Sequence, residues 1–561
     1  MTGTGAPLPN RSRFWSGVLI AAMVVGAFLR LQQIGAQVLI DDEWHAVHQF
    51  IARSPADMFF DFGYADYSIP LGILDWYQAQ WWGVSELTLR WPMLACGLLT
   101  LVVLPLYVAP RLGRATAAAF ALLLAISPLL VIFSRMARPY AITVLVGWIA
   151  HGAYQRFNAY EDAGSRGRIG AGAIYAVAAA LATWLHPVVG PFVVAPLLWG
   201  LAQLCRTPRA DRRRAFLRWL ALAATTGALI GVFVLPPLLM HPMSLASKGG
   251  LDVPDVQTLA GVWYAWLGTP STAVLVACVA LAACGAPVVW RALPEARTGA
   301  LGVVLTLALV VATGPMWSHL PVTVSRYLLP FVPLLLLAVA AGTLRIAALI
   351  GTPPTGARRA LALLALAFPF VLLLAQWPLA PLLRHPNSQT QHLVNYIDFR
   401  PDENPYVPQF AAMPLSPYWA TLAARPRGSL RIAAAPFYFE SYDWDAPRWE
   451  RLSGQTVIPG YLTGLCVPRR GGELPRDPRY RFANAARLAD AADLDAKAID
   501  YVAWQKPYRL NVAGHIESIG ADTAMCEAVL RERFGTPSYE DSHIIVFPVP
   551  HPNAAMPNAP R

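Results

Sequence analysis

The chain has 561 residues, of which 56% are hydrophobic and only 14% are charged, and its mean hydropathy is +0.43. A soluble protein would carry about 25% charged residues, so the composition excludes an ordinary soluble enzyme. The formal charge of +11 would suggest nucleic-acid binding in a soluble protein. Here the basic residues fall mainly between apolar segments and near the C-terminus. We therefore expect membrane lipids, and no nucleic acid, as their partners.

Long apolar segments recur through the first 383 residues and then stop. They predict a polytopic α-helical membrane protein, with a transmembrane domain over residues 1–383 and about eleven spans. We expect the spans near residues 14–39, 88–110, 115–133, 140–158, 171–187, 188–204, 217–239, 271–290, 299–317, 327–345 and 360–380. The first span is too long for a signal peptide and no small-x-small cleavage pattern stands before Asp41, so we expect it to be retained.

The chain after the last apolar segment is polar and rich in proline. Alternating strand and helix patterns predict a small soluble α/β domain over residues 384–550, followed by a disordered tail, residues 551–561. The expected strands are Arg431–Ala435, Ile499–Trp504 and His543–Val549, and the expected helices are Ala483–Leu494 and Asp522–Phe534.

Arginine is concentrated in every second connection between the predicted spans. The clusters are Arg11 and Arg13; Arg111 and Arg114; Arg156, Arg166 and Arg168; Arg206, Arg209, Arg212, Arg213 and Arg214; Arg291 and Arg297; and Arg345, Arg358 and Arg359. The opposite connections carry acidic residues, such as Asp42, Asp57 and Asp252. By the positive-inside rule, we expect a multi-pass protein of a bacterial inner membrane. Its N-terminus would be cytoplasmic and its C-terminal domain periplasmic or extracellular.

Two of the six cysteines, Cys466 and Cys526, lie in the predicted C-terminal domain. The other four lie within or at the ends of apolar segments and are expected to be packing residues. Outside the cytoplasm, Cys466 and Cys526 can form a disulfide. Two unpaired thiols are the alternative.

The first outer loop, residues 41–87, is unusually long. Its segments Trp44–Arg53 and Pro70–Trp82 are both expected to form short amphipathic helices. The second carries Trp76, Tyr77, Trp81 and Trp82, which suit the membrane–water interface. Long loops with helices of their own are usually functional, so we look for a site here.

Three consecutive carboxylates, Asp41, Asp42 and Glu43, follow the first span directly. Charge at that depth is costly unless it is functional or lies in the headgroup layer, and a carboxylate can take a proton from a hydroxyl nucleophile. The alternative is that Asp41 or Asp42 caps the next helix. His45 and His48 lie close behind and could share a metal, but the sequence defines no third ligand. A solvated interfacial role is favoured for both histidines. No cofactor is firmly indicated, and a divalent metal remains only an option.

Other polar side chains are expected at the same membrane face. They are Arg135, Arg138 and Tyr140 between the third and fourth spans, His186 at the end of the fifth, Lys248 in the loop near residues 240–270, and Arg326 and Tyr327 at the start of the tenth. Arginine holds phosphate through paired hydrogen bonds, and a lipid phosphate is the obvious anion at a membrane surface. Headgroup anchoring by the arginines, packing of His186 and solvation of Lys248 are the alternatives.

These motifs, in this order, resemble the GT-C membrane glycosyltransferases over about residues 14–345. The resemblance is to the group of protein O-mannosyltransferases and aminoarabinose transferases, of glycosyltransferase family 39 type. It is carried by Asp42-Glu43 after the first span, Pro70-Leu71, Leu89–Pro92, Ser127-Pro128, Ser134–Tyr140 and Arg326–Pro330. The resemblance implies a polyprenyl-phosphate sugar donor such as undecaprenyl phosphate, inversion at the sugar, and an extracytoplasmic site.

Two departures from that pattern narrow the expectation. Some members carry a second acidic residue in the second outer loop, where this chain has Arg135 and Arg138 and no acid. The first outer loop has no lysine, whereas aminoarabinose transferases are expected to use one nearby. We therefore expect a sugar other than aminoarabinose and no clear metal dependence.

The sequence as a whole predicts an integral-membrane glycosyltransferase in which Asp42 is the general base. Asp41 or Glu43 is expected to assist by orienting it. The expected ligands of the lipid phosphate are Arg135, Arg138, Tyr140, His186, Lys248, Arg326 and Tyr327. The acceptor would be an envelope glycan, a lipid or a secreted protein.

Two other classes of protein remain open. A transporter or flippase of lipid-linked sugars would show internal repeats and ionisable groups near the bilayer midplane. We find no convincing repeat, and the ionisable groups cluster at span ends. A non-catalytic membrane assembly subunit would depend on its soluble domain and not on Asp42.

Overall fold

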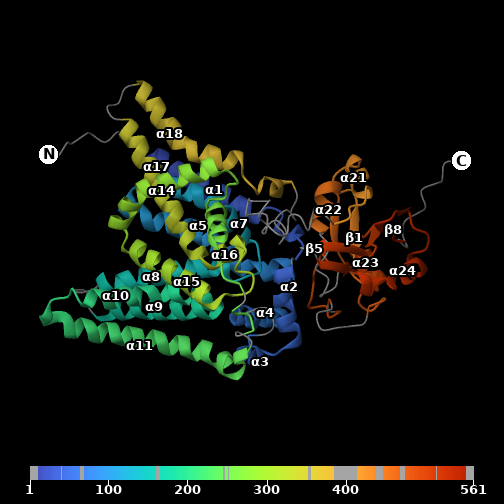
Figure 1. Ribbon diagram of the computed structural model, residues 1–561, viewed down its shortest axis with the longest axis horizontal. Helices are drawn as coiled ribbons and strands as arrows, with labels where there is room; N and C mark the ends of the chain where they lie inside the picture. The colour runs from blue at the N-terminus through green and yellow to red at the C-terminus, as the bar shows by residue number, and fades with distance from the viewer. Residues whose placement is uncertain are drawn as a thin grey trace.

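The structure, a computed structural model, combines a bundle of helices with a mixed α/β domain at one end of it (Figure 1). It describes residues 11–39, 41–62, 68–159, 165–243, 247–250, 252–351, 356–384, 413–436, 446–467, 474, 476–512 and 515–550. The predicted disordered tail, residues 551–561, lies outside this part of the chain.

The described part of the bundle contains nine helices that are long and apolar enough to cross a membrane. A bent pair, α6 and α7, would make a tenth. The helices that match the predicted spans are α1 (Arg11–Leu31), α5 (Glu86–Leu112), α6 (Arg114–Ile126), α7 (Pro128–Ser134), α8 (Tyr140–Ala159), α9 (Ser165–Leu185), α10 (Gly190–Leu204), α11 (Arg209–Met240), α14 (Thr272–Ala292), α15 (Pro294–Thr313), α17 (Val332–Ile350) and α18 (Gly356–Ala375). The chain is thus a multi-pass helical membrane protein.

Two of the predicted spans differ in detail from expectation. The segment near 115–133 is divided between α6 and α7, which meet at 61° where Pro128 begins the second helix. The segment near 140–158 is helix α8, which is long enough to cross a membrane but less apolar than the nine helices counted above. His151, Gln155 and Arg156 lower its hydropathy.

The bundle is held together partly by small residues at helix crossings. A Cβ atom on Gly342 of α17 would lie 1.8 Å from the carbonyl oxygen of Leu281, and one on Gly285 of α14 would lie 2.0 Å from that of Ala338. The backbones of α14 and α17 therefore meet directly, as is common between membrane helices. This packing fixes α17, which follows the segment that carries Arg326.

Three short helices of the first outer loop lie at the end of the bundle that faces the α/β domain (Figure 1). They are α2 (Asp41–Ala52), α3 (Pro55–Phe59) and α4 (Ile69–Trp81). The two predicted loop helices are confirmed, although α2 begins three residues earlier than expected. The sequence analysis missed α3, although Ser54 and Asp57 form a capping box around its first turn and Pro55 opens it. Two further short helices are α13 (Val256–Leu267) and α16 (Pro321–Tyr327), and α16 carries Arg326.

The C-terminal domain contains a six-stranded sheet in the order β3-β2-β1-β4-β8-β7. The first four strands in this order are parallel, and β8 and β7 are antiparallel to their neighbours. The strands are β1 (Arg431–Ala435), β2 (Thr456–Tyr461), β3 (Ala486–Arg487), β4 (Tyr501–Gln505), β7 (Tyr539–Glu540) and β8 (Ile544–Pro548), with β5 (Tyr508–Val512) and β6 (His515–Ile519) forming a separate hairpin. Helices α21 (Tyr418–Thr421), α22 (Ala446–Ser453), α23 (Ala491–Ala496) and α24 (Cys526–Phe534) accompany the sheet.

The predicted α/β character and all three predicted strands of this domain are confirmed. The predicted helix over 483–494 is wrong, because this stretch contains β3 and only the beginning of α23. Asp490 explains where the helix starts: its side chain accepts the backbone N–H groups of Ala492 and Asp493, as an N-cap does.

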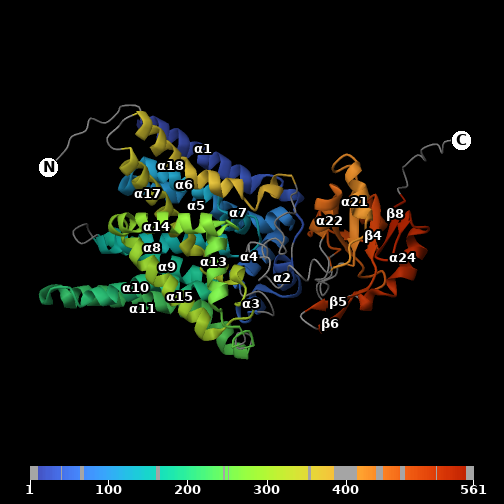
Figure 2. The same ribbon diagram turned by 45° about the horizontal axis from the view of Figure 1, so that its top comes forward.

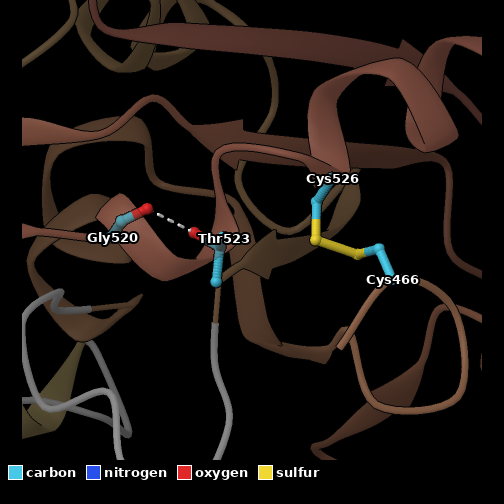
Figure 3. The surroundings of a disulfide bond; sticks show 4 residues. All are labelled: Cys466, Gly520, Thr523 and Cys526. Carbon is cyan, nitrogen blue, oxygen red and sulfur yellow. Dashed lines mark hydrogen bonds between the residues drawn. A yellow bond between two sulfur atoms is a disulfide. The ribbon is translucent and has the colours of Figure 1, made fainter. Parts of the chain in front are cut away.

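The Cys466 and Cys526 side chains are joined in a disulfide across 60 residues of sequence (Figure 3). The bond ties the segment that follows β2 to the first residue of α24. The turn before α24 is closed by the Thr523 hydroxyl, which donates to the Gly520 carbonyl at 2.8 Å. The other four cysteines are free thiols in the bundle.

Candidate functional site

The candidate site lies at the beginning of α2, where one carboxylate meets two arginines from distant parts of the chain. Arg326 Nη1 in α16 lies 3.1 Å from Asp42 Oδ2, and the two side chains are only 17% and 15% exposed. Arg138, in the turn between α7 and α8, donates to the backbone carbonyl of Asp42 at 3.3 Å. Three segments separated by up to 284 residues therefore converge on Asp42.

The charges around Asp42 favour its ionised form. Burial raises the pKa of this carboxyl, but the positive charges of Arg138 and Arg326, with a contribution from His45, outweigh burial. The net pKa is therefore lower than the ordinary value of 3.8. Asp42 is thus a carboxylate at any physiological pH, as a proton acceptor must be.

Aromatic rings enclose the other side of Arg326. Its guanidinium carbon lies 5.7 Å from the ring centroids of both Tyr140 and Tyr327, within range of a cation–π interaction. The His186 ring lies 5.4 Å from that of Tyr140 and 5.3 Å from that of Tyr327. The structure therefore brings together six residues that the sequence proposed separately: Asp42, Arg138, Tyr140, His186, Arg326 and Tyr327. We call them the Asp42 cluster.

Arg326 Nε and His186 Nδ1 are among the nitrogen atoms of the Asp42 cluster that are buried without a hydrogen-bond partner in the described part of the chain. A buried donor that lacks a partner is costly. Arg326 lies beside the Asp42 carboxylate, and His186 lies against the Tyr140 and Tyr327 rings. An oxygen-rich anion at this position would accept from Arg326 Nε, and from His186 Nδ1 in the tautomer that carries its proton there.

Glu43, the neighbour of Asp42, is fully engaged elsewhere. Its two carboxylate oxygens accept Arg90 Nε and Nη2, each at 2.7 Å, and both side chains are completely buried. The backbone N–H of Ala137 also donates to Glu43 Oε1 at 2.8 Å. Arg90 further donates to three backbone carbonyls just before α2, those of Ile34, Gln37 and Val38. Glu43 therefore anchors α2 to α5, and sequence reasoning missed Arg90 as its partner.

Arg135 is completely buried and lies against the end of α1 instead of beside Asp42. Its Nη1 atom donates to the carbonyls of Leu29, Arg30 and Gln32 at 3.2, 3.0 and 2.8 Å. These groups belong to the C-terminal end of α1, where carbonyls lack helical partners and a positive charge is favourable. Arg135 is thus a capping residue of α1.

This capping role leads to a prediction about stability. Arg135→Met should lower the free energy of unfolding by on the order of 2 kcal/mol or more, because several carbonyls lose a charged donor. Thermal unfolding of the detergent-solubilised protein, followed by intrinsic fluorescence, measures the effect. The matched control is Arg111→Met, since Arg111 is exposed and its side chain donates to the Tyr107 carbonyl of its own helix. Equal unfolding temperatures for the two variants would contradict the capping role.

The remaining candidates are Asp41, His48 and Lys248. Asp41 is the first residue of α2, and its side chain lies outside the described part of the structure. The His48 ring stacks on Trp44 with 6.1 Å between centroids. Lys248 lies on a loop, and its backbone carbonyl accepts the Met316 N–H at 2.8 Å. No three His, Cys, Asp or Glu side chains in the described chain are grouped as a metal site would require.

No family model and no curated protein matches the sequence. The chain is similar in structure to ArnT from Cupriavidus metallidurans bound to undecaprenyl phosphate, with 12% identity, 96% of this chain and 98% of that chain covered, and a TM-score of 0.44. Against ArnT in the apo state the identity is 13%, the coverage is the same and the TM-score is 0.41. The Archaeoglobus fulgidus oligosaccharyltransferase in complex with Zn and sulfate is 13% identical, with 90% of this chain and 73% of that chain covered and a TM-score of 0.38.

Proposed function

We propose that this protein is a membrane glycosyltransferase of the GT-C type. It moves a sugar from a polyprenyl-phosphate donor to an acceptor hydroxyl, with inversion, on the extracytoplasmic face of a bacterial inner membrane. The observation that carries the proposal is the Asp42 cluster, in which an ionised carboxylate and two arginines meet at one end of a membrane bundle. A base for the acceptor and cations for a phosphate are the groups that this reaction needs.

The reaction balances with these groups alone. Asp42 takes the proton of the acceptor hydroxyl as its oxygen attacks the anomeric carbon. The new bond forms on the face opposite the phosphate, and the bond from the anomeric carbon to the phosphate oxygen breaks. The polyprenyl phosphate leaves with the electron pair and needs no proton, because its negative charge is stabilised by Arg138 and Arg326.

The contacts of each side chain favour a narrower assignment of roles than the sequence did. Arg138 and Arg326 are proposed to hold the phosphate, and Tyr140, Tyr327 and His186 to shape its pocket. Arg135 and Glu43 are given structural roles, because their polar atoms already bind other groups. We still predict that Asp41 helps to orient Asp42 and that Lys248 contacts the phosphate.

The proposed orientation has two supports. Arginine clusters mark one face of the bundle, which the positive-inside rule assigns to the cytoplasm. The disulfide between Cys466 and Cys526 suits a domain outside the reducing cytoplasm. The Asp42 cluster and the C-terminal domain would then share the extracytoplasmic side, where lipid-linked sugars meet envelope acceptors.

A comparison of strains tests the proposed activity and identifies both substrates at the same time. Envelope lipids, glycans and secreted proteins of a deletion strain are compared by mass spectrometry with those of the same strain carrying the wild-type gene. We expect one class of molecule to lose the mass of a single sugar in the deletion strain. An unchanged set of sugar masses in the deletion strain would contradict the proposed transfer.

The charges around Asp42 also predict a pH dependence. In the wild type, the acid limb of kcat/KM due to Asp42 should lie below pH 3.8, because the arginines lower the pKa of this carboxyl. Arg326→Gln removes one of the charges that lower the pKa of Asp42. Burial, which raises this pKa, then has a larger share in it, so the acid limb should move to higher pH. Rates measured between about pH 4 and 8 should fall toward the acid end in this variant.

The matched control for this pH profile is Arg53→Gln, just after the first outer-loop helix, where Arg53 pairs with Asp61 at 2.7 Å. Its profile should follow that of the wild type. The same linkage applies to stability: a carboxyl with a lowered pKa stabilises the fold above its unfolded pKa and loses this contribution as the pH falls through its folded pKa. An identical acid limb in Arg326→Gln and wild type would contradict the proposed coupling.

A further inference from the structure

The C-terminal domain is joined to the first outer loop by main-chain hydrogen bonds. The Val84 N–H donates to the Arg479 carbonyl at 2.7 Å, and the Arg481 N–H donates to the Val84 carbonyl at 2.7 Å. Val84 and Tyr480 thus form an isolated parallel β-bridge just before α5. We call residues 479–484 the docking segment.

Side chains reinforce the docking segment on both sides. The carboxylate of Glu86, only 3% exposed, accepts the backbone N–H groups of Asn484 at 2.7 Å and Ala483 at 3.2 Å. The side-chain amide of Asn484 donates to the Gly35 carbonyl at 2.8 Å, in the short connection that leads into α2. Arg479 donates to the side chain of Gln80 at 2.5 Å. The domain is therefore held by specific polar contacts before and after α2.

Helix α2 itself is covered by aromatic residues of the C-terminal domain. The Trp44 ring lies 5.3 Å from that of Phe482 and 5.6 Å from that of Tyr461, and Trp44 is only 5% exposed. Further along α2, Phe50 stacks on Tyr480 with 6.3 Å between centroids. Figures 1 and 2 both show the domain at the end of the bundle where α2 lies.

One end of α2 is therefore tied to α5 through Glu43 and Arg90, and one of its sides is covered by the C-terminal domain. Asp42 lies at the beginning of this helix, two residues before Trp44. A helix of only 12 residues is marginal alone, so its position depends on these contacts. A carboxylate that must meet an acceptor hydroxyl tolerates little displacement, since a shift of about 1 Å can cost on the order of 100-fold in rate.

We infer that the C-terminal domain acts as a clamp on α2 and holds Asp42 in register with Arg138 and Arg326, with Phe482 and Glu86 as positioning residues. This inference rests on the proposed function, because it assigns the consequence to the transfer reaction. It differs from a role of the domain in acceptor binding, which would act on KM for the acceptor.

The test uses Phe482→Ala and Glu86→Gln in the full-length protein, with Glu540→Gln as the matched control. Glu540 pairs with Arg531 and Lys506 within the C-terminal domain and is remote from the docking segment in sequence and contacts. Hydrogen–deuterium exchange over residues 41–52 should accelerate in both test variants and stay unchanged in the control. Exchange in α8 should stay slow in all three.

Kinetics provide the second readout. Both test variants should lose on the order of 100-fold in kcat, with KM for the acceptor unchanged. The acid limb of their pH profiles should lie at higher pH than that of the wild type. Phe482→Tyr, which keeps the aromatic ring, should retain most of the wild-type rate. Unchanged exchange in α2 would overturn the clamp, whatever the protein catalyses. Faster exchange with normal kcat, or a change confined to acceptor KM, would overturn the positioning role. If exchange in α2 is faster in both test variants but Asp42→Asn is fully active, the proposed function is contradicted. The stabilisation of α2 by the C-terminal domain is then still supported.

Discussion

Asp42→Asn should lower kcat for sugar transfer by about 10²–10⁴-fold, the range typical of losing a general base. The amide keeps the shape of the side chain and its position beside Arg326, which lies 3.1 Å from the carboxylate. It cannot accept the proton of the acceptor hydroxyl. The measurement is the initial rate of transfer by purified protein in detergent, with the donor and acceptor identified by the envelope comparison.

Two controls separate loss of chemistry from loss of fold. Asp61→Asn changes another carboxylate of the first outer loop, paired with Arg53 and only partly buried, and should retain wild-type rates. Size-exclusion profiles and unfolding temperatures should show that the Asp42→Asn protein is folded. A folded Asp42→Asn protein with a normal rate would remove Asp42 from the reaction.

Glu43→Gln should have a large effect on stability. Glu43 and Arg90 are both completely buried and form two hydrogen bonds of 2.7 Å. Removing one charge leaves the other buried without compensation, which costs about 3–5 kcal/mol. We expect a matching fall in the unfolding temperature and in abundance, with Arg90→Met showing a similar effect.

The double variant Glu43→Gln/Arg90→Met tests whether the pair explains this loss. Replacing both partners removes the uncompensated charge, so the double variant should be more stable than the sum of the single effects predicts. Activity per folded molecule should remain measurable in all three. A Glu43→Gln protein of wild-type stability that has lost transfer would instead give Glu43 a chemical role.

Features that are encoded in short stretches of the sequence could be predicted from the sequence alone. Apolar length located the helices of the bundle, and polar residues at helix ends located Asp42, Arg138, His186 and Arg326. Short strand patterns between polar, proline-rich stretches located β1, β4 and β8. These signals lie within a few residues of the feature that they predict.

Side-chain contacts between segments that are far apart in the sequence could not be predicted in this way. Asp42 and Glu43 are adjacent, yet they point about 100° apart on a helix, and only the packing of α2 against α5 shows which one meets Arg90. Arg135 and Arg138 lie three residues apart, yet one caps α1 and the other reaches Asp42. The contact of the docking segment with Glu86 spans 398 residues, which no local pattern records.

The central claim is that Asp42 performs the chemistry of sugar transfer, and complementation of the deletion strain tests it most directly. Envelope molecules are compared by mass spectrometry in strains that carry wild-type, Asp42→Asn or Asp61→Asn protein at equal abundance in the membrane. We predict that the Asp42→Asn strain lacks the same single-sugar mass as the deletion strain, while the Asp61→Asn strain regains it. A full return of that mass in the Asp42→Asn strain would contradict the account.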